Sequence, residues 1–94
     1  MMKNDLSIII VNYKSWDKLQ LCLDSVLNQN QINLQIIIVD NFSNDNRLKD
    51  FKIRFKQINW IENKNNLGFA KACNIGATHS ESKWLLFLNP DTIL

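Results

Sequence analysis

The chain alternates short, strongly apolar runs with segments in which apolar residues recur every three or four positions. Four runs have the length and composition of buried strands: residues 6–11, 34–39, 58–61 and 84–88. Helical periodicity marks the three segments between them. A β-α-β-α-β-α-β order predicts an α/β fold with a parallel sheet, right-handed crossovers and helices on its faces. For a doubly wound sheet of this kind we expect three layers and the strand order 3-2-1-4.

The first helix is expected to begin at Trp16, because apolar residues recur from there through Val26 at spacings of three and four. Ser15 is its expected N-cap, since a serine hydroxyl can accept a hydrogen bond from a free amide of the first helical turn. Residues 28–33 are polar and are expected to end the helix.

The third helix is expected over residues 69–79, with Phe69, Cys73 and Ala77 on its apolar side. Cys22 and Cys73 lie far apart in the chain and form no CxxC motif. We therefore interpret both cysteines as small buried apolar residues of a reducing compartment.

Size and charge exclude several classes of protein. The chain has 94 residues and a formal net charge of +2, and its charges of both signs are interspersed. That length predicts a single small domain over residues 1–94, and that charge argues against a nucleic-acid partner. The apolar run 8–11 is too short for a signal-peptide core or a membrane span. A cytoplasmic location is the expectation by default.

Each predicted strand is followed by a polar segment: residues 12–15, 40–45, 63–68 and 89–91. Ligands of open parallel sheets bind at the carboxyl ends of the strands, so these four segments are expected to form one edge. Asp40 and Asp91 each lie at or just past the end of an apolar run. A carboxylate in that position is either a helix cap or part of a site.

Glycine-based phosphate sites are missing. The chain has two glycines, Gly68 and Gly76, and neither follows the first strand. A G-x-G-x-x-G fingerprint and a Walker A loop are therefore both absent, which argues against a dehydrogenase fragment. The phosphates of any nucleotide would need a cation from elsewhere, and Asp91 could hold a divalent metal through its hard oxygen atoms.

Four strings occur in a fixed order at the predicted strand ends. They are SIIIVNY from Ser7, IIVDNFS from Ile37, NLGFA from Asn66 followed by Asn74, and LFLNPDT from Leu86. Together they resemble the N-terminal half of family 2 glycosyltransferases, which have the Rossmann-like GT-A fold, and most of all the branch that includes bacterial rhamnosyltransferases. The resemblance covers nearly the whole chain. It implies a transferase that moves a sugar from a UDP- or dTDP-sugar, with rhamnose as one candidate, usually with inversion.

The resemblance assigns the nucleotide-binding residues. Tyr13 matches an aromatic residue that packs on the base, although a tyrosine on a surface turn is the plainer alternative. Asp40 and Asn41 match a pair that recognises the base, where the common pattern has two aspartates. An amide can still accept from a base N–H group and donate to a base carbonyl. Asp40 could instead cap the second helix or brace its loop.

The third and fourth segments also have counterparts. Asn66 and Gly68 match the loop after the third strand, where Gly68 either contacts the ligand or only permits a positive φ. Asn74 matches a recurring asparagine, and a helix-to-loop hydrogen bond would explain it equally well. Many members of the family have, at the position of Cys73, an arginine that faces the diphosphate. In this chain the nearby cation is Lys71. 

The string Asn89-Pro90-Asp91 matches the D-x-D motif with its first aspartate replaced. Asp91 keeps the position that holds Mg²⁺ or Mn²⁺ against the diphosphate, and Asn89 would face the sugar or the ribose. A metal there would stabilise the charge of the departing diphosphate.

No residue of this chain matches the catalytic base or the acceptor site, which in the family lie downstream of the D-x-D motif. His79 is no substitute, because it is expected to be exposed at a helix end. We therefore expect the 94-residue chain to bind a nucleotide sugar weakly without transferring the sugar to its saccharide or lipid-linked acceptor. The usual setting is the synthesis of bacterial surface polysaccharide, at the inner face of the membrane for a full-length enzyme.

The expected sheet is truncated after its fourth strand, so residues 84–88 would form an apolar edge. Exposed apolar edges pair with other chains, and self-association through this edge is expected. Two alternatives to the transferase remain. One is a non-catalytic nucleotide-binding module or remnant. The other is a signalling receiver domain, which would need an acidic pair where this chain has Asn12 and Tyr13.

Overall fold

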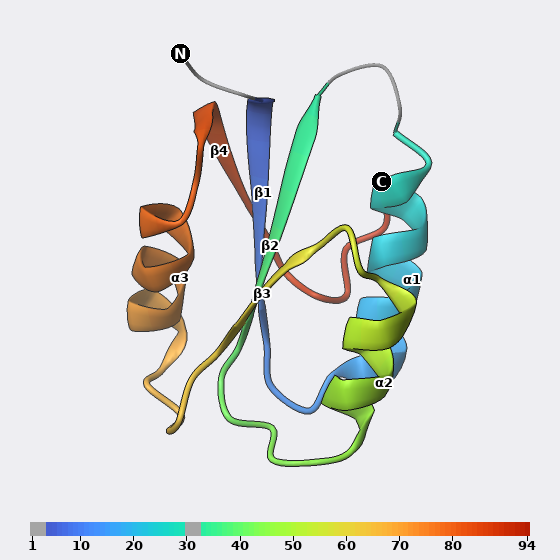
Figure 1. Ribbon diagram of the computed structural model, residues 1–94, viewed down its shortest axis with the longest axis vertical. Helices are drawn as coiled ribbons and strands as arrows, with labels where there is room; N and C mark the ends of the chain where they lie inside the picture. Colours follow the sequence, from blue (N-terminus) through green and yellow to red (C-terminus); the bar gives the residue numbers. More distant parts are fainter. Residues whose placement is uncertain (1–3, 30–32) are drawn as a thin grey trace.

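The computed structural model describes residues 4–29 and 33–94 and contains a four-stranded parallel sheet with three helices. The strands are β1 (Asn4–Asn12), β2 (Leu34–Asp40), β3 (Asn59–Glu62) and β4 (Ser82–Leu88), and the helices are α1 (Trp16–Leu27), α2 (Arg47–Arg54) and α3 (Phe69–Thr78). The sheet order is β3-β2-β1-β4, which confirms the expected 3-2-1-4. In Figure 1 the sheet is seen nearly edge-on, with α3 on one face and α1 and α2 on the other.

The first helix begins at Trp16 as expected and ends at Leu27. Of the segment 28–33, residues 30–32 lie outside the described residues. Ser15 is the N-cap residue as expected, but the expected capping hydrogen bond is wrong, because the Ser15 hydroxyl donates to the backbone oxygen of Tyr13 instead. The side chain that serves the turn before α1 belongs to Asn12, whose Oδ1 accepts from the Ser15 amide at 3.3 Å.

The larger core lies between the sheet and helices α1 and α2. The central strands are apolar on both faces, so alternate residues of β1 and β2 supply two separate cores. Ile8 and Ile10 belong to the core under α1 and α2, which is centred on the fully buried Phe51. The rings of Phe51 and Trp16 pack with centroids 4.9 Å apart, which joins the two helices on this face.

The smaller core lies under α3 and depends on small residues. Ala72 and Gly76 are buried against Ile9, Ile37 and Val39. The expected apolar side of this helix was therefore partly wrong: Cys73 and Ala77 are half-buried, but Phe69 is 60% exposed. Small side chains let the helix backbone approach the sheet closely, so the face with Ala72 and Gly76 packs inward.

A buried polar cluster crosses the sheet near the amino ends of the strands. Ser7 Oγ lies 2.8 Å from Gln35 Oε1 and 2.7 Å from Ser82 Oγ, which joins three strands. Gln35 Nε2 donates to Asn59 Oδ1 at 3.2 Å and to the backbone oxygen of His79 at 3.3 Å. Within the described residues every buried side-chain nitrogen and oxygen has a partner, so this cluster fixes the strand register without an unsatisfied group.

In the part of the chain that the structure describes, strand β4 pairs only with β1 and is largely uncovered. Four consecutive apolar side chains of this strand are between 38% and 63% exposed: Trp84, Leu85, Leu86 and Phe87. Since successive side chains point to opposite faces, both faces of the strand are open, and so is its outer backbone edge.

Because α3 lies close to the sheet at Gly76, we expect a larger residue at this position to destabilise the fold. A Cβ atom placed there would lie 2.6 Å from Cγ2 of Ile9, a branched side chain buried in the central strand. We expect Gly76→Ala to lower the free energy of unfolding by about 1–2 kcal/mol, because the overpacking outweighs the gain in helix propensity. Urea denaturation followed by circular dichroism measures the change.

The matched control is Asn74→Ala, an exposed position of the same helix. It should raise the free energy of unfolding by a few tenths of a kcal/mol, since alanine is the better helix former. Stabilisation by both substitutions would contradict the packing described for Gly76.

Candidate functional site

The polar segments after β1, β2 and β3 lie at one edge of the sheet, the lower end in Figure 1. This is the arrangement that the parallel order predicts. Two buried side chains, Asp40 and Asn41, join these segments by hydrogen bonds. Among the described residues, the segment after β4 makes no hydrogen bond to the other three.

Asp40 joins the first two segments. Its side chain is buried, and its carboxylate accepts from Asn12 Nδ2 at 3.0 Å, from Ser43 Oγ at 2.7 Å and from the Ser43 amide at 3.0 Å. Ser43 Oγ in turn accepts from the amide of Lys14 at 2.8 Å. The alternative in which Asp40 braces its loop is therefore confirmed, while its contact with a base stays a prediction.

Asn41 joins the second and third segments. Its side chain is 3% exposed. Oδ1 accepts from Asn63 Nδ2 at 3.1 Å and from the Leu67 amide at 2.9 Å. Nδ2 donates to Asn66 Oδ1 at 3.0 Å and to the backbone oxygen of Gly68 at 3.1 Å. Both sides of the amide are thus engaged within the protein.

Gly68 has the positive φ that the sequence suggested, +81° with ψ 168°. Only glycine adopts this backbone region readily. A Cβ atom at Gly68 would meet no atom within 4 Å, so the backbone angle and not crowding requires glycine here. Asn66 is exposed, and its Oδ1 also accepts from the Gly68 amide at 2.9 Å.

Within residues 4–29 and 33–94, three residues other than glycine have positive φ, and all three lie in the segments after β1 and β2: Lys14 (53°), Phe42 (67°) and Asn44 (55°). Such conformations cost on the order of 1–3 kcal/mol each for residues other than glycine and cluster at functional sites. Phe42 is also 42% exposed. No sequence pattern singles out Phe42, because a phenylalanine with a strained backbone looks like any other phenylalanine in the sequence.

Phe42 lines a cavity of about 620 Å³ between the ends of β2 and β3 and the start of α2. Asp45, Glu62, Asn63 and Lys64 also line it. A volume of this size is within the range of small-molecule sites. The cavity adjoins Asp40 and Asn63, so it opens beside the hydrogen-bonded segments and extends toward α2.

Tyr13 is 45% exposed, and Lys14 Nζ lies 5.3 Å from the centroid of its ring. An accessible aromatic ring can pack on a base, and a cation beside it can contact a phosphate. The structure therefore leaves Tyr13 available for the base contact that the sequence predicted.

Asn89 and Asp91 are exposed in the segment after β4. The Asp91 amide donates to Asn89 Oδ1 at 3.4 Å, and the chain continues to α1, where the Leu94 amide donates to Ser25 Oγ. Burial, with the Asp91 charge adding to it, raises the pKa of the Cys22 thiol. Asp91 thus lies on the α1 side, and in the described part of the chain it makes no hydrogen bond or ion pair to the predicted residues of the other three segments.

The Asp91 carboxylate suits a divalent metal as a single ligand. It is exposed, it is a hard oxygen donor, and no described side chain donates to it. No group of three or more His, Cys, Asp or Glu in residues 4–29 and 33–94 could hold a metal by itself. Mg²⁺ is often held by one or two carboxylates together with substrate phosphates, so the residue fits a metal carried by a diphosphate.

The remaining side chains of α3 are peripheral. Lys71 and Asn74 are exposed, and Asn74 has no hydrogen bond to a loop in the described part of the chain, so that explanation for it is wrong. His79 is exposed at the helix end as expected, with Nδ1 2.9 Å from the backbone oxygen of Ile75. Cys73 is half-buried, and Cys22 and Cys73 are free thiols.

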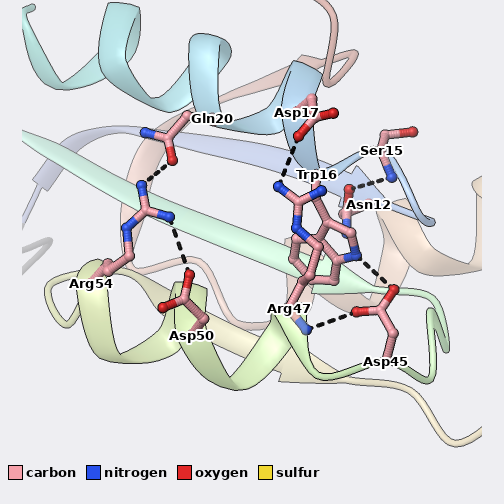
Figure 2. A network of polar contacts seen from close by, with 9 residues as sticks. All are labelled: Asn12, Ser15, Trp16, Asp17, Gln20, Asp45, Arg47, Asp50 and Arg54. Carbon is pink, nitrogen blue, oxygen red and sulfur yellow. Dashed lines mark hydrogen bonds and ion pairs between the residues drawn. The ribbon is translucent and has the colours of Figure 1, made fainter.

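A second polar network holds the starts of α1 and α2 together behind the site (Figure 2). Trp16 Nε1 donates to Asp45 Oδ2 at 2.9 Å, and Asp45 Oδ1 accepts from the Arg47 amide at 3.0 Å. Arg47 Nη2 also bonds Asp17 at 2.8 Å, but this pair is exposed. The Trp16–Asp45 bond therefore fixes the segment after β2 against α1.

The chain matches the family model described as Glycosyl transferase family 2 over residues 7–94. An uncharacterized glycosyltransferase of Haemophilus influenzae is 35% identical over 86 residues, which cover 92% of this chain and 29% of that protein. The poly(ribitol-phosphate) beta-N-acetylglucosaminyltransferase TarP of Staphylococcus aureus is 33% identical over 99 residues, covering 95% of this chain and 29% of TarP. The chain thus spans less than a third of the length of these relatives.

Solved structures have the same fold. The crystal structure of S. aureus TarS 1-349 superposes with a TM-score of 0.84 at 21% identity, over 95% of this chain and 28% of that one. The mannosyltransferase PcManGT from Pyrobaculum calidifontis, in complex with GDP-Man and Mn²⁺, gives a TM-score of 0.82 at 18% identity, over 96% and 28% of the two chains. At these identities the likeness establishes the GT-A fold.

The hydrogen bonds of the buried Asp40 carboxylate are expected to stabilise the fold. In Asp40→Asn an N–H2 group replaces one of the two accepting oxygens and faces a donor from Asn12 or Ser43. We expect the free energy of unfolding to fall by about 2 kcal/mol, the cost of leaving buried groups unpaired. The control Asp17→Asn changes the same side chain at a position that is 91% exposed, and it should stay within about 0.5 kcal/mol of wild type. Equal effects of the two substitutions would contradict the role of Asp40.

Proposed function

The chain belongs to glycosyl transferase family 2, and we propose that it forms the part of such an enzyme that binds the nucleotide-sugar donor. The observation that carries this proposal is the family match together with the polar strand ends, which meet where parallel sheets bind ligands. The activity proposed for the whole enzyme is transfer of a sugar from a nucleoside diphosphate to an acceptor hydroxyl with inversion.

Exposure divides the predicted residues into two groups. Tyr13, Asn66, Gly68 and Asn89 are exposed, and we assign them the direct contacts with the nucleotide and its sugar. Asp40 and Asn41 are buried and hydrogen-bonded within the protein. Direct recognition of a pyrimidine by this pair stays a prediction, because a base would have to replace bonds that the pair already makes.

Asp91 is the proposed ligand for Mg²⁺ or Mn²⁺, with the diphosphate and water supplying the other oxygen atoms. A bound metal supplies Lewis-acid stabilisation of the departing diphosphate. The protein contributes the exposed carboxylate and, beside Tyr13, the cationic Lys14. The mannosyltransferase with a similar fold was solved with GDP-Man and Mn²⁺, which supports a metal-dependent donor site.

The donor proposed first is a UDP-sugar, with a dTDP-sugar such as dTDP-rhamnose as the second candidate. The name of TarP, a poly(ribitol-phosphate) N-acetylglucosaminyltransferase, supports an acceptor that belongs to a bacterial surface polymer, saccharide or lipid-linked. Relatives are more than three times as long as this chain. We place the catalytic base and the acceptor site in the portion of the relatives that this chain does not span.

The proposed setting is the cytoplasm, with the full-length enzyme at the inner face of the membrane. The free thiols of Cys22 and Cys73 support a reducing compartment. Among the described residues no helix has the length and apolar character needed to cross a bilayer.

Binding of the donor is tested by calorimetric titration of the chain with UDP- and dTDP-sugars, with and without Mn²⁺. We expect Mn²⁺ to increase the affinity for the donor, and Asp91→Ala to lower that affinity about tenfold or more, since it removes a charged ligand. Asp24→Ala, at an exposed position of α1, is the matched control and should bind as wild type does.

Two outcomes of these measurements would contradict the assignments. Equal binding by Asp91→Ala and wild type would remove Asp91 from the metal role. Sugar transfer by the pure 94-residue chain would contradict the placement of the catalytic base outside it.

For the isolated chain we propose self-association through β4, so that the partner is a second copy of the same chain. The free edge of β4 can form backbone hydrogen bonds with the same edge of another molecule. This pairing would also bury the exposed apolar row of β4. We expect sedimentation velocity to show dimers or larger species whose fraction increases with concentration.

Trp84→Lys places a charge in this exposed row and should shift the sample toward monomer. Ile53→Lys changes an apolar residue of α2 that is 58% exposed, and should leave the distribution unchanged. A wild-type chain that stays monomeric at high concentration would rule out this association.

A further inference from the structure

The Asn41 amide is oriented by two backbone groups whose roles are fixed. The Leu67 N–H can only donate, so the atom that faces it at 2.9 Å is the oxygen of the side chain. The Gly68 carbonyl can only accept, so the atom that faces it at 3.1 Å is the nitrogen. The orientation of Asn41 therefore does not depend on the choice between oxygen and nitrogen that is ambiguous for many amides.

The Asn66 amide is oriented in the same way. The Gly68 N–H donates to it at 2.9 Å, and Asn41 Nδ2 donates to the same atom at 3.0 Å, so this atom is Oδ1. The N–H2 group of Asn66 then lies on the other side. It has no bond to any described residue, and the side chain is exposed. The loop thus presents two free N–H donors to solvent at the strand-end edge.

A carboxylate at position 41 could not make these bonds. One oxygen could still accept from Asn63 and Leu67, but the other would face two acceptors, Asn66 Oδ1 and the Gly68 carbonyl. Asn66 could turn its amide to donate, but the Gly68 N–H would then lose its acceptor and the outward group would become an oxygen. Repulsion between the carboxylate and these two acceptors would disturb the loop, and a turn of Asn66 would exchange its outward N–H2 group for an oxygen. Either change removes the arrangement of free donors.

We propose that Asn41 is a positioning residue whose amide holds the loop 63–68, so that the N–H2 group of Asn66 faces the donor nucleotide. Asn41 acts through Asn66 and Gly68 and does not read the base itself. The ligand group that meets Asn66 is an acceptor, a base carbonyl or a phosphate oxygen. The inference rests on the proposed nucleotide-sugar function. Within that function, it states that position 41 requires an amide.

The loop is tested without any ligand by amide hydrogen exchange measured by NMR. In Asn41→Asp we expect the protection factors of Leu67 and Gly68 to fall by about tenfold or more, since the loop is no longer held through Asn66 and the Gly68 carbonyl. The amides of Ile37 and Ile38, in the central core, should keep their protection and so report that the fold is intact. If the substitution unfolds the chain, Asn66→Ala provides the same test from the exposed side, and the Gly68 amide should lose protection there.

Acid provides a readout that simple loss of packing would not give. Lowering the pH protonates the new carboxyl of Asn41→Asp, and the protonated form can donate to Asn66 or Gly68. The two facing acceptors raise the pKa of this carboxyl above the ordinary value of about 3.9. Part of the lost protection should therefore return as the pH falls through that pKa, while wild type shows no such recovery.

Nucleotide binding distinguishes positioning from direct recognition. With UDP and Mn²⁺ as ligands, Asn41→Asp should bind about tenfold more weakly as a result of the altered loop. Asn66→Asp is the matched variant: its carboxylate can still accept from Asn41 and Gly68, so loop protection should stay within about twofold of wild type. UDP affinity should still fall about tenfold or more, because an oxygen replaces the outward N–H2 group.

Two outcomes would overturn the proposal. One is unchanged protection of Leu67 and Gly68 in Asn41→Asp, and with weaker UDP binding it would indicate direct recognition by Asn41. The other is normal UDP binding by Asn66→Asp. Failure of wild type to bind UDP would count against the proposed function and the donor contact of Asn66, while the exchange measurements would still decide whether Asn41 holds the loop.

Discussion

The register between β1 and β2 is the constraint on which both ends of the molecule depend. Ser7 lies opposite Gln35, and Asn12 lies opposite Asp40, in the same parallel ladder. A shift of one residue would turn every side chain of a strand to the other face and separate both pairs. The apolar residues between the pairs make this register favourable, because they fill the two cores only in one alternation. Packing in the middle of the sheet thereby places the polar groups at its ends.

The two polar ends have different consequences. At the amino ends of the strands, Ser7 and Gln35 satisfy each other and their neighbours within the sheet, so this cluster specifies which strands pair. At the carboxyl ends, Asp40 bonds to Asn12 at the end of β1 and to Ser43, and Asn41 bonds to the segment 63–68. Ser43 and the segment 63–68 have no regular secondary structure. Their bonds shape loops that would otherwise have many conformations, and fixing a loop in advance reduces the entropy that a ligand must overcome on binding. The strained φ angles of Lys14, Phe42 and Asn44 in these loops are consistent with such pre-organisation.

Much of the fold followed from the sequence, because periodicity reports burial and burial decides helix and strand. The strand order and the polar edge were predicted from the alternation of apolar runs and helical segments. The errors concern local alternatives of similar energy. Ser15 is the N-cap residue, but its hydroxyl donates to Tyr13 instead of capping the helix, and the Ser15 amide bonds the Asn12 side chain that β1 places beside it. Phe69 fitted an apolar helix face, but the close approach through Gly76 turned a neighbouring face inward.

The sequence by itself determined that polar residues follow each strand and which residue types stand there, since these are properties of the order along the chain. The tertiary structure decided which of them remain available to a ligand. Asp40 and Asn41 are the best candidates by type, yet hydrogen bonds to Asn12, Ser43, Asn63 and Asn66 engage them. Most of those partners are more than twenty positions away in the chain, so only folding brings the competing donors and acceptors together and leaves the N–H2 group of Asn66 free.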